Sequence, residues 1–192
     1  MTRILVIGDT HIPDRAEQIP SALIEYIDSG KPWDIVAFTG DFTEREILEW
    51  TYSLGREVYV VRGNMDYLPL PKSAIFNVGE IIFGIHHGDG VYPLGNIIKL
   101  SEIASRLGAH VLLTGHTHRD SVRMGVGNKV LLLNPGSLTG VWGGEGGSYI
   151  PSLMVLNVNG SSVHVRTVRF VNNEIREIDS VAMWSNGLWR LA

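Results

Sequence analysis

The sequence contains no cysteine among its 192 residues. This excludes disulfide bonds, thiolate metal sites, iron–sulfur clusters and cysteine nucleophiles together. Long apolar runs are also missing, since the runs Ile4 to Ile7 and Val130 to Leu133 are far shorter than the ~18 residues that cross a bilayer. The N-terminal run is likewise too short for a secretory signal. We therefore expect a cytoplasmic protein that does not enter a membrane.

A surplus of positive charge is absent as well. Sixteen Lys and Arg residues stand against twenty Asp and Glu residues, which gives a formal net charge of −4. A basic surface that holds long nucleic acid is therefore not expected. Hydrophobic residues make up 44% of the chain, which is ample for a folded core, and we find no repeat and no linker-like stretch. The sequence predicts a single domain over residues 1–192.

The first half of the chain alternates strand-like and helix-like segments. Short apolar, β-rich runs indicate strands, and apolar residues at helical spacing indicate helices between them. We expect strands at 3–7, 34–39, 57–61, 80–86 and 110–114, and helices near 22–27, 43–54 and 96–107. This alternation is typical of parallel strands joined by helical crossovers.

The second half lacks helical periodicity. Short β-rich runs are separated by Gly127-Asn128, Asn159-Gly160 and Asn172-Asn173, which suit tight hairpins. We expect an antiparallel meander from about 120 to 181, and two sheets packed face to face with helices outside. The aromatic end of the chain, 183–192, is compatible with covering a sheet edge or with forming a partner surface such as that of a homodimer.

Side chains that can bind metals follow each of the five best predicted strands. The segments are Gly8-Asp9-Thr10-His11, Gly40-Asp41, Gly63-Asn64-Met65-Asp66, His87-Gly88-Asp89 and Gly115-His116-Thr117-His118. Taken alone, most of these segments are better explained as turns or ordinary polar residues, and only the pair His116 and His118 is explained equally well as metal ligands. Ligands of open α/β sheets bind beyond the carboxyl ends of the strands, where such loops meet. The five segments together therefore predict one metal centre.

The types of side chain indicate which ions the centre binds. Carboxylates and imidazoles without thiolates suit Mn²⁺, Fe²⁺, Zn²⁺, Co²⁺ or Ni²⁺ better than Ca²⁺. A carboxylate that bridges two divalent ions would offset their repulsion. We expect two divalent metal ions, with Mn²⁺ as the first choice, and a positive spot that attracts phosphate to an acidic protein.

The ordered set Asp-x-His, Gly-Asp, Gly-Asn-x-Asp, His-Gly and Gly-His-x-His resembles the calcineurin-like metallophosphoesterases. It is most similar to the small single-domain phosphodiesterases of the YfcE type, over nearly the whole chain. The resemblance implies an α/β (α+β) fold, a four-layer α-β-β-α sandwich of two mixed β-sheets flanked by helices. It also implies a metal-dependent phosphodiesterase that hydrolyses a small phosphoester by in-line attack of a hydroxide bridging two divalent metals.

The resemblance further assigns metal ligands. The first ion would be held by Asp9, His11 and His118, and the second by Asn64, His87 and His116, with Asp41 bridging both. The residues expected to act in catalysis are Asp41, Asn64 and His87.

Other residues near these loops are expected to support the site. Asp66 and Asn134 are candidates for orienting the ligands, and Ser137 for a hydrogen bond beside the metals. Arg15, Arg62 and Arg119 are candidates for binding the substrate phosphate. Trp142, in the glycine-rich loop 140–147, is a candidate wall of the site. For each of these residues the alternative to a role in the site, that of a turn residue or a solvated side chain, stays open.

One position departs from larger members of the family. Where many of these carry a histidine thought to assist the leaving group, this chain has Met65. A thioether cannot donate a proton, so the acid that protonates the leaving group is unassigned.

Two alternatives remain besides a phosphodiesterase. One is a non-catalytic scaffold on the same fold, as the retromer subunit of this fold chiefly is, and the other is a nuclease of the same superfamily. Scaffolds tend to lose ligands, whereas all seven expected ligand positions are occupied here. A nuclease would need a basic stripe, which the scattered arginines and lysines do not form.

Overall fold

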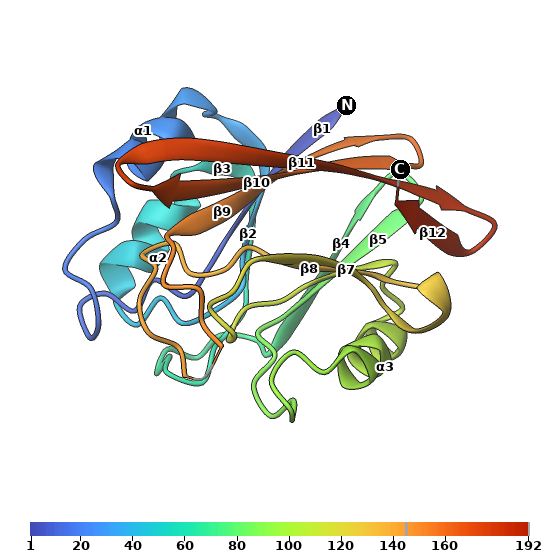
Figure 1. Ribbon diagram of the computed structural model, residues 1–192, viewed down its shortest axis with the longest axis horizontal. Helices are drawn as coiled ribbons and strands as arrows, with labels where there is room; N and C mark the ends of the chain where they lie inside the picture. Colours follow the sequence, from blue (N-terminus) through green and yellow to red (C-terminus); the bar gives the residue numbers. More distant parts are fainter. Residues whose placement is uncertain (145, 192) are drawn as a thin grey trace.

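The computed structural model describes residues 1–144 and 146–191 (Figure 1). Glu145, within the glycine-rich loop, and Ala192 lie outside these residues. In chain order the elements are β1 (Thr2–Ile7), α1 (Ser21–Ser29), β2 (Trp33–Phe38), α2 (Arg45–Tyr52), β3 (Gly55–Val60), β4 (Ser73–Val78), β5 (Ile81–His86), α3 (Ile97–Leu107), β6 (Val111–Leu113), β7 (Ser121–Met124), the 3₁₀ turn η1 (Val126–Asn128), β8 (Leu131–Asn134), β9 (Ser152–Asn159), β10 (Ser162–Val171), β11 (Glu174–Ser185) and β12 (Leu188–Leu191).

The strands form two mixed sheets. The seven-stranded sheet has the order β12-β11-β10-β9-β1-β2-β3, and the five-stranded sheet has the order β4-β5-β6-β8-β7. Strands β1, β2 and β3 are mutually parallel, as are β5, β6 and β8, while the remaining pairs are antiparallel. The parallel strands point their carboxyl ends the same way within each sheet, which gathers the loops that follow them.

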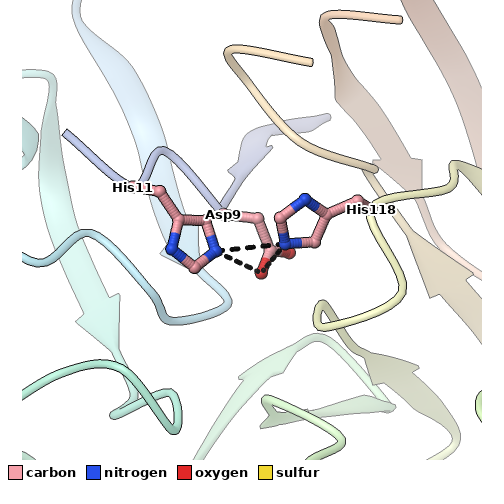
Figure 2. Close-up of side chains that lie close together, drawn as sticks. All are labelled: Asp9, His11 and His118. Carbon is pink, nitrogen blue, oxygen red and sulfur yellow. Dashed lines mark hydrogen bonds and ion pairs between the residues drawn. The ribbon is translucent and has the colours of Figure 1, made fainter. Parts of the chain in front are cut away.

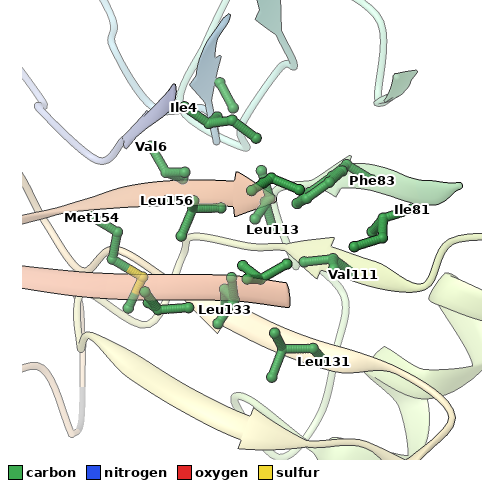
Figure 3. Close-up of a cluster of buried hydrophobic side chains, with 14 of the residues drawn as sticks. Ile4, Val6, Ile81, Phe83, Val111, Leu113, Leu131, Leu133, Met154 and Leu156 are labelled. Atoms are coloured by element: carbon green, nitrogen blue, oxygen red, sulfur yellow. The ribbon is translucent and has the colours of Figure 1, made fainter. Parts of the chain in front are cut away.

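Alternation along the strands explains the layers. In β1, Ile4 and Val6 pack into a core shared with Leu113 and Leu133 of the other sheet (Figure 3). Their neighbours Leu5 and Ile7 face the opposite way, into a second core that includes residues of α1. Because successive strand residues point to opposite faces, the central strand β1 is buried on both sides.

The five-stranded sheet shows the same alternation. Val111 and Leu113 of β6 join the core between the sheets, whereas Leu112 packs outward with Leu100 of α3. In Figure 1, α1 and α2 lie on one side of the paired sheets and α3 on the other. This is the four-layer α-β-β-α sandwich that the sequence predicted.

Helix boundaries follow local sequence signals. Helix α3 begins after Asn96, whose side chain accepts a hydrogen bond from the backbone amide of Lys99 at 3.1 Å. It ends at Gly108, which takes the left-handed φ of 65°. The predicted helix 43–54 is shorter than expected, since the regular helix α2 covers Arg45–Tyr52.

The expected antiparallel meander is corrected in two respects. First, it is divided: β7 and β8 belong to the five-stranded sheet, and β9 to β12 to the seven-stranded sheet. Second, β8 pairs in parallel with β6, so the region is not wholly antiparallel. The three predicted hairpin turns are present, between β7 and β8, β9 and β10, and β10 and β11.

Two further elements were not predicted as strands. Strand β4 lies at an edge and leaves Ile75 48% exposed, so its apolar pattern does not resemble that of a buried strand. The aromatic C-terminal segment forms the end of β11 and the edge strand β12, with Trp189 fully buried. Among the described residues, no helix combines the length and apolar character needed to cross a membrane.

Candidate metal centre

The predicted ligands lie in the loops after β1, β2, β3, β5 and β6, and their backbones are unusual. Asp9, His11, Asp41, His116 and His118 all have positive φ, between 47° and 68°. Residues other than glycine rarely adopt this left-handed conformation, and where they do, function is a common reason. In these loops a strained backbone conformation accompanies side chains that converge on the two candidate metal groups.

The first group of side chains consists of Asp9, His11 and His118 (Figure 2). The Nε2 atoms of His11 and His118 are 3.1 Å apart, and His118 Nε2 lies 3.4 Å from Asp9 Oδ1. All three residues are buried. The chain therefore brings a carboxylate and two imidazoles from two distant loops to one point.

The second group consists of Asp41, His87 and His116. Asn64 joins it, because its Oδ1 lies 3.1 Å from His87 Nε2. Asp41 Oδ2 lies 3.3 Å from His87 Nε2 and also 3.3 Å from His11 Nε2. Asp41 thus stands between the two groups, where a bridging carboxylate would be needed.

The chemistry of this donor set fits divalent cations. Two buried carboxylates and facing imidazole nitrogens concentrate lone pairs in a site with little water to solvate them. Nitrogen and oxygen donors of this kind suit Mn²⁺, Fe²⁺ or Zn²⁺. The first ion would be held by the Asp9 group and the second by the Asp41 group with Asn64.

Backbone carbonyls orient two of the imidazoles. His87 donates from Nδ1 to the carbonyl of Thr39 at 2.8 Å, and His118 donates from Nδ1 to the carbonyl of Val141 at 2.8 Å. A carbonyl can only accept, so each of these bonds keeps a proton on Nδ1 and makes Nε2 the nitrogen that would bind a metal. The Nδ1 of His11 is buried and has no partner among the described residues.

Burial and the carboxylates move the pKa values of these groups apart. Burial lowers the pKa of His11 to about 4, against the opposing effect of Asp41 and Asp9. Burial also acts to lower the pKa of His87, but the hydrogen bond to Asp41 and the negative charges of Asp9 and Asp41 raise it to about 9. Burial acts to raise the pKa of Asp41, but the contacts with His87, the backbone amide of Met65 and His11 together lower it. At neutral pH the pair therefore forms a buried carboxylate and imidazolium.

Asp66 and Asn134 hold the loops that carry the ligands. The Asp66 carboxylate accepts hydrogen bonds from the backbone amides of Asp41 and Gly63 at 2.8 Å and of Thr43 at 2.9 Å. Asn134 donates from Nδ2 to the Gly115 carbonyl at 2.8 Å, immediately before His116. Both residues are buried, and these contacts of their side chains are with the backbone of the loops that carry the candidate ligands.

Ser137 lies beside the first group. Its hydroxyl donates to the carbonyl of Asp9 at 2.7 Å and accepts from the amide of Gly140 at 3.0 Å. A hydroxyl held in this way is a structural link between the Asp9 loop and the glycine-rich loop. The sequence interpretation of Ser137 as a hydrogen-bonding residue agrees with this geometry.

The three candidate arginines lie in different surroundings. Arg15 donates to the carbonyl of Trp142 at 2.8 Å, its guanidinium stacks 5.3 Å from the Trp142 ring, and both residues line the hollow over the metal groups. Arg119 lines a neighbouring cavity, together with Arg123, which the sequence motifs did not single out. Arg62 lines neither hollow.

Comparison with known proteins gives a family for this arrangement. The model of the calcineurin-like phosphoesterase superfamily domain matches residues 2–159. Two archaeal proteins described as probable metallophosphoesterases are similar in sequence. That of Methanocaldococcus jannaschii is 42% identical over 70% of this chain and 67% of its own, and that of Methanothermobacter thermautotrophicus is 36% identical over 85% and 90%.

A solved structure shares the fold. Vacuolar protein sorting 29 (Vps29) of Entamoeba histolytica, crystallised as the wild type in complex with Zn²⁺, superposes with a TM-score of 0.84 at 30% identity. The similarity covers 93% of this chain and 98% of that one.

Proposed function

Because the chain belongs to the calcineurin-like phosphoesterase superfamily, we propose that it is a metal-dependent phosphodiesterase acting on a small phosphoester. The observation that carries this proposal is the position of Asp41, whose Oδ2 lies 3.3 Å from an imidazole of each ligand group. A shared carboxylate of this kind is what a pair of divalent ions requires. Manganese is the first choice of ion on the grounds of ligand type.

Divalent ions bound by the two groups would supply positive charge for the phosphate oxygens and would acidify an attacking water. Residues of the chain that do not bind the ions would hold the ligating side chains in place. The carbonyls of Thr39 and Val141 keep two imidazoles in the metal-binding tautomer, and Asp66 fixes the amides around Asp41. A site with its dipoles fixed in advance needs little reorganisation during the reaction.

Protonation of the leaving group is the step for which this chain offers no side chain in the Asn64 motif. Met65 is 41% exposed beside Asn64 and has no proton to donate. We therefore expect esters of good leaving groups, such as aryl phosphates, to be hydrolysed faster than alkyl esters. Equal rates on both would contradict this part of the proposal.

The test is hydrolysis of bis(p-nitrophenyl) phosphate by the purified protein. A chelator should abolish the activity and Mn²⁺ should restore it. Asp41→Asn should lower both the metal content and the rate, the rate by on the order of 10² or more, because the shared carboxylate is lost. Asp14→Asn, at an exposed carboxylate in the loop after β1, is the matched control and should retain both.

A protein-binding scaffold is the second candidate function, supported by the similarity to vacuolar protein sorting 29. The two candidates differ in turnover and not in metal content, since a scaffold could also bind ions. Metal-loaded protein that hydrolyses no aryl phosphate ester would favour the scaffold and would overturn the phosphodiesterase proposal.

A further inference from the structure

A second cavity adjoins the metal centre on the side of the five-stranded sheet. Its volume is about 150 Å³, and its walls include Gly115 and Thr117, which flank His116, and Gly88, which follows His87. His116 itself lines the hollow over the metal groups. The two hollows are therefore lined by consecutive residues of one loop, His116 on one side and Gly115 and Thr117 on the other. A substrate whose phosphate lies over the candidate metal groups would reach the cavity by passing this loop.

Most of the cavity wall comes from β7, β8, the loop between β6 and β7, and the segment around the start of α3. In the antiparallel pair of β7 and β8, Arg123 stands opposite Leu132 and Ser121 opposite Asn134. Residues opposite one another share a face of the sheet. Leu132 packs against α3, so the face that it shares with Arg123 is the outer face of the sheet. Ser121 and Arg123 lie on this face and line the cavity beside α3.

The charged side chains of the cavity are both arginines, Arg119 and Arg123. Within residues 1–144 and 146–191, no acidic side chain lines the cavity and no carboxylate lies within 4.0 Å of either guanidinium. Asp120, the acidic neighbour of Arg119 in the chain, is held by Arg169 at 2.6 Å instead. Arg119 and Arg123 are both exposed, and two guanidiniums at one cavity favour an anion there.

The rest of the lining indicates the size of the group that binds. Leu94, Leu100 and Leu132 form an apolar wall, while Thr117 and Ser121 offer hydroxyls. A volume of about 150 Å³ admits a few carbon atoms and one anionic group, and a cavity of this volume elsewhere holds a single benzene ring. A large aglycone or a polynucleotide does not fit.

We infer that this cavity is a binding site for a second anionic group of the substrate, a phosphate or carboxylate carried a few atoms from the scissile phosphate. Arg119 and Arg123 would bind that group, while the apolar wall contacts the short carbon chain between the two anions. The inference rests on the proposed phosphoesterase activity and narrows its substrate class to small doubly anionic phosphoesters.

The kinetic test compares three p-nitrophenyl phosphodiesters in the presence of Mn²⁺. Their second ester groups share a three-carbon skeleton and are 3-hydroxypropyl, which is neutral at its far end, 3-phosphooxypropyl and 2-carboxyethyl. The wild type should prefer each compound that carries the second anion by about tenfold or more in kcat/KM, the size of a charged hydrogen bond. Comparing the phosphate with the carboxylate shows which anion the cavity prefers.

The variants Arg119→Gln and Arg123→Gln should each remove most of that preference. Arg176→Gln, an exposed arginine on β11 of the other sheet, is the charge-matched control and should retain it. Equal kcat/KM values on all three compounds in the wild type, or a preference that survives both cavity variants, would overturn the inference.

A binding measurement keeps the inference testable apart from turnover. Propane-1,3-bisphosphonate cannot be hydrolysed, and calorimetry should show that Arg123→Gln weakens its binding to the metal-free protein about fivefold or more. Unchanged binding would overturn the cavity assignment. Failure to hydrolyse any ester, bis(p-nitrophenyl) phosphate included, would instead overturn the proposed function, and the calorimetry would still decide the cavity assignment.

Discussion

At the scale of single residues, the centre depends on side chains that do not bind metal. Asp66 satisfies three backbone amides, those of Asp41, Thr43 and Gly63, in a buried position. Asp66→Ala would leave these donors without an acceptor, so we expect the free energy of unfolding to fall by about 3 kcal/mol. Urea denaturation measures this loss.

The control for Asp66→Ala is Asp14→Ala at an exposed position, which should change stability by less than about 0.5 kcal/mol. Asp66→Asn, which keeps one acceptor oxygen, should fall between the two. If Asp66→Ala were as stable as the control, Asp66 would not be what holds the Asp41 loop.

The raised pKa of His87 predicts how metal affinity depends on pH. In the metal-free protein His87 is protonated below about pH 9, and an ion must displace that proton to bind. His11, with its pKa lowered to about 4, is already neutral at pH 7 and releases none. Affinity should therefore rise between pH 7 and 9, by up to about tenfold per pH unit for one released proton.

Competition with a chromophoric chelator at pH 7, 8 and 9 measures this slope. A constant affinity over the range would mean that His87 carries no proton in the free protein. It would contradict the buried ion pair of His87 with Asp41.

At the scale of elements, the glycine-rich loop is part of the metal centre. The Val141 carbonyl fixes the tautomer of His118, and a methyl group on Gly143 would overlap the His118 ring. Gly143→Ala should therefore displace His118 and weaken metal binding by about tenfold or more, because misplaced supports of a ligand cost 10–100-fold in affinity.

Gly147→Ala is the matched control within the same loop. A methyl group there would lie 3.7 Å from the Cβ atom of His118, an ordinary contact. Calorimetric titration of both variants with Mn²⁺ separates them. Equal affinities would show that the loop does not set the position of His118.

The same scale shows which features the sequence could predict. The candidate ligands could be named because their own side chains carry the signal after five apolar strands, and the structure brings them together in two groups. The supporting role of Val141 could not be found, because a backbone carbonyl is independent of the residue type. Arg123 was missed for another reason: it enters the cavity only through the pairing of β7 with β8, a neighbour relation that no local pattern specifies.

The sequence likewise could not predict that the strands of the second half are divided between two sheets. An apolar strand such as β8 shows that it is buried, but its pattern does not name β6, rather than β9, as its neighbour. Strand β4 was not predicted, because an edge strand with exposed Ile75 lacks the continuous apolar run of a buried strand.

At the scale of the whole molecule, one core joins the two sheets that carry the ligand loops. Leu133 of β8 is fully buried there against residues of the seven-stranded sheet. All five tryptophans lie outside the five-stranded sheet, at 33, 50, 142, 184 and 189. Leu133→Ala should nevertheless lower the stability reported by tryptophan fluorescence, by about 2–5 kcal/mol.

Ile98→Ala on α3, 60% exposed, is the control and should shift stability by less than about 0.5 kcal/mol. Urea unfolding followed by fluorescence and by far-ultraviolet circular dichroism should give coincident transitions. A Leu133→Ala variant that changes only the dichroism would mean that the sheets unfold separately.

The central claim is that loops from both sheets form one centre for two ions that share Asp41. Anomalous diffraction from crystals soaked in Mn²⁺ tests it most directly. We expect two peaks, one beside Asp9, His11 and His118 and one beside Asn64, His87 and His116, with Asp41 contacting both. A single peak, or none near these side chains, would contradict the account.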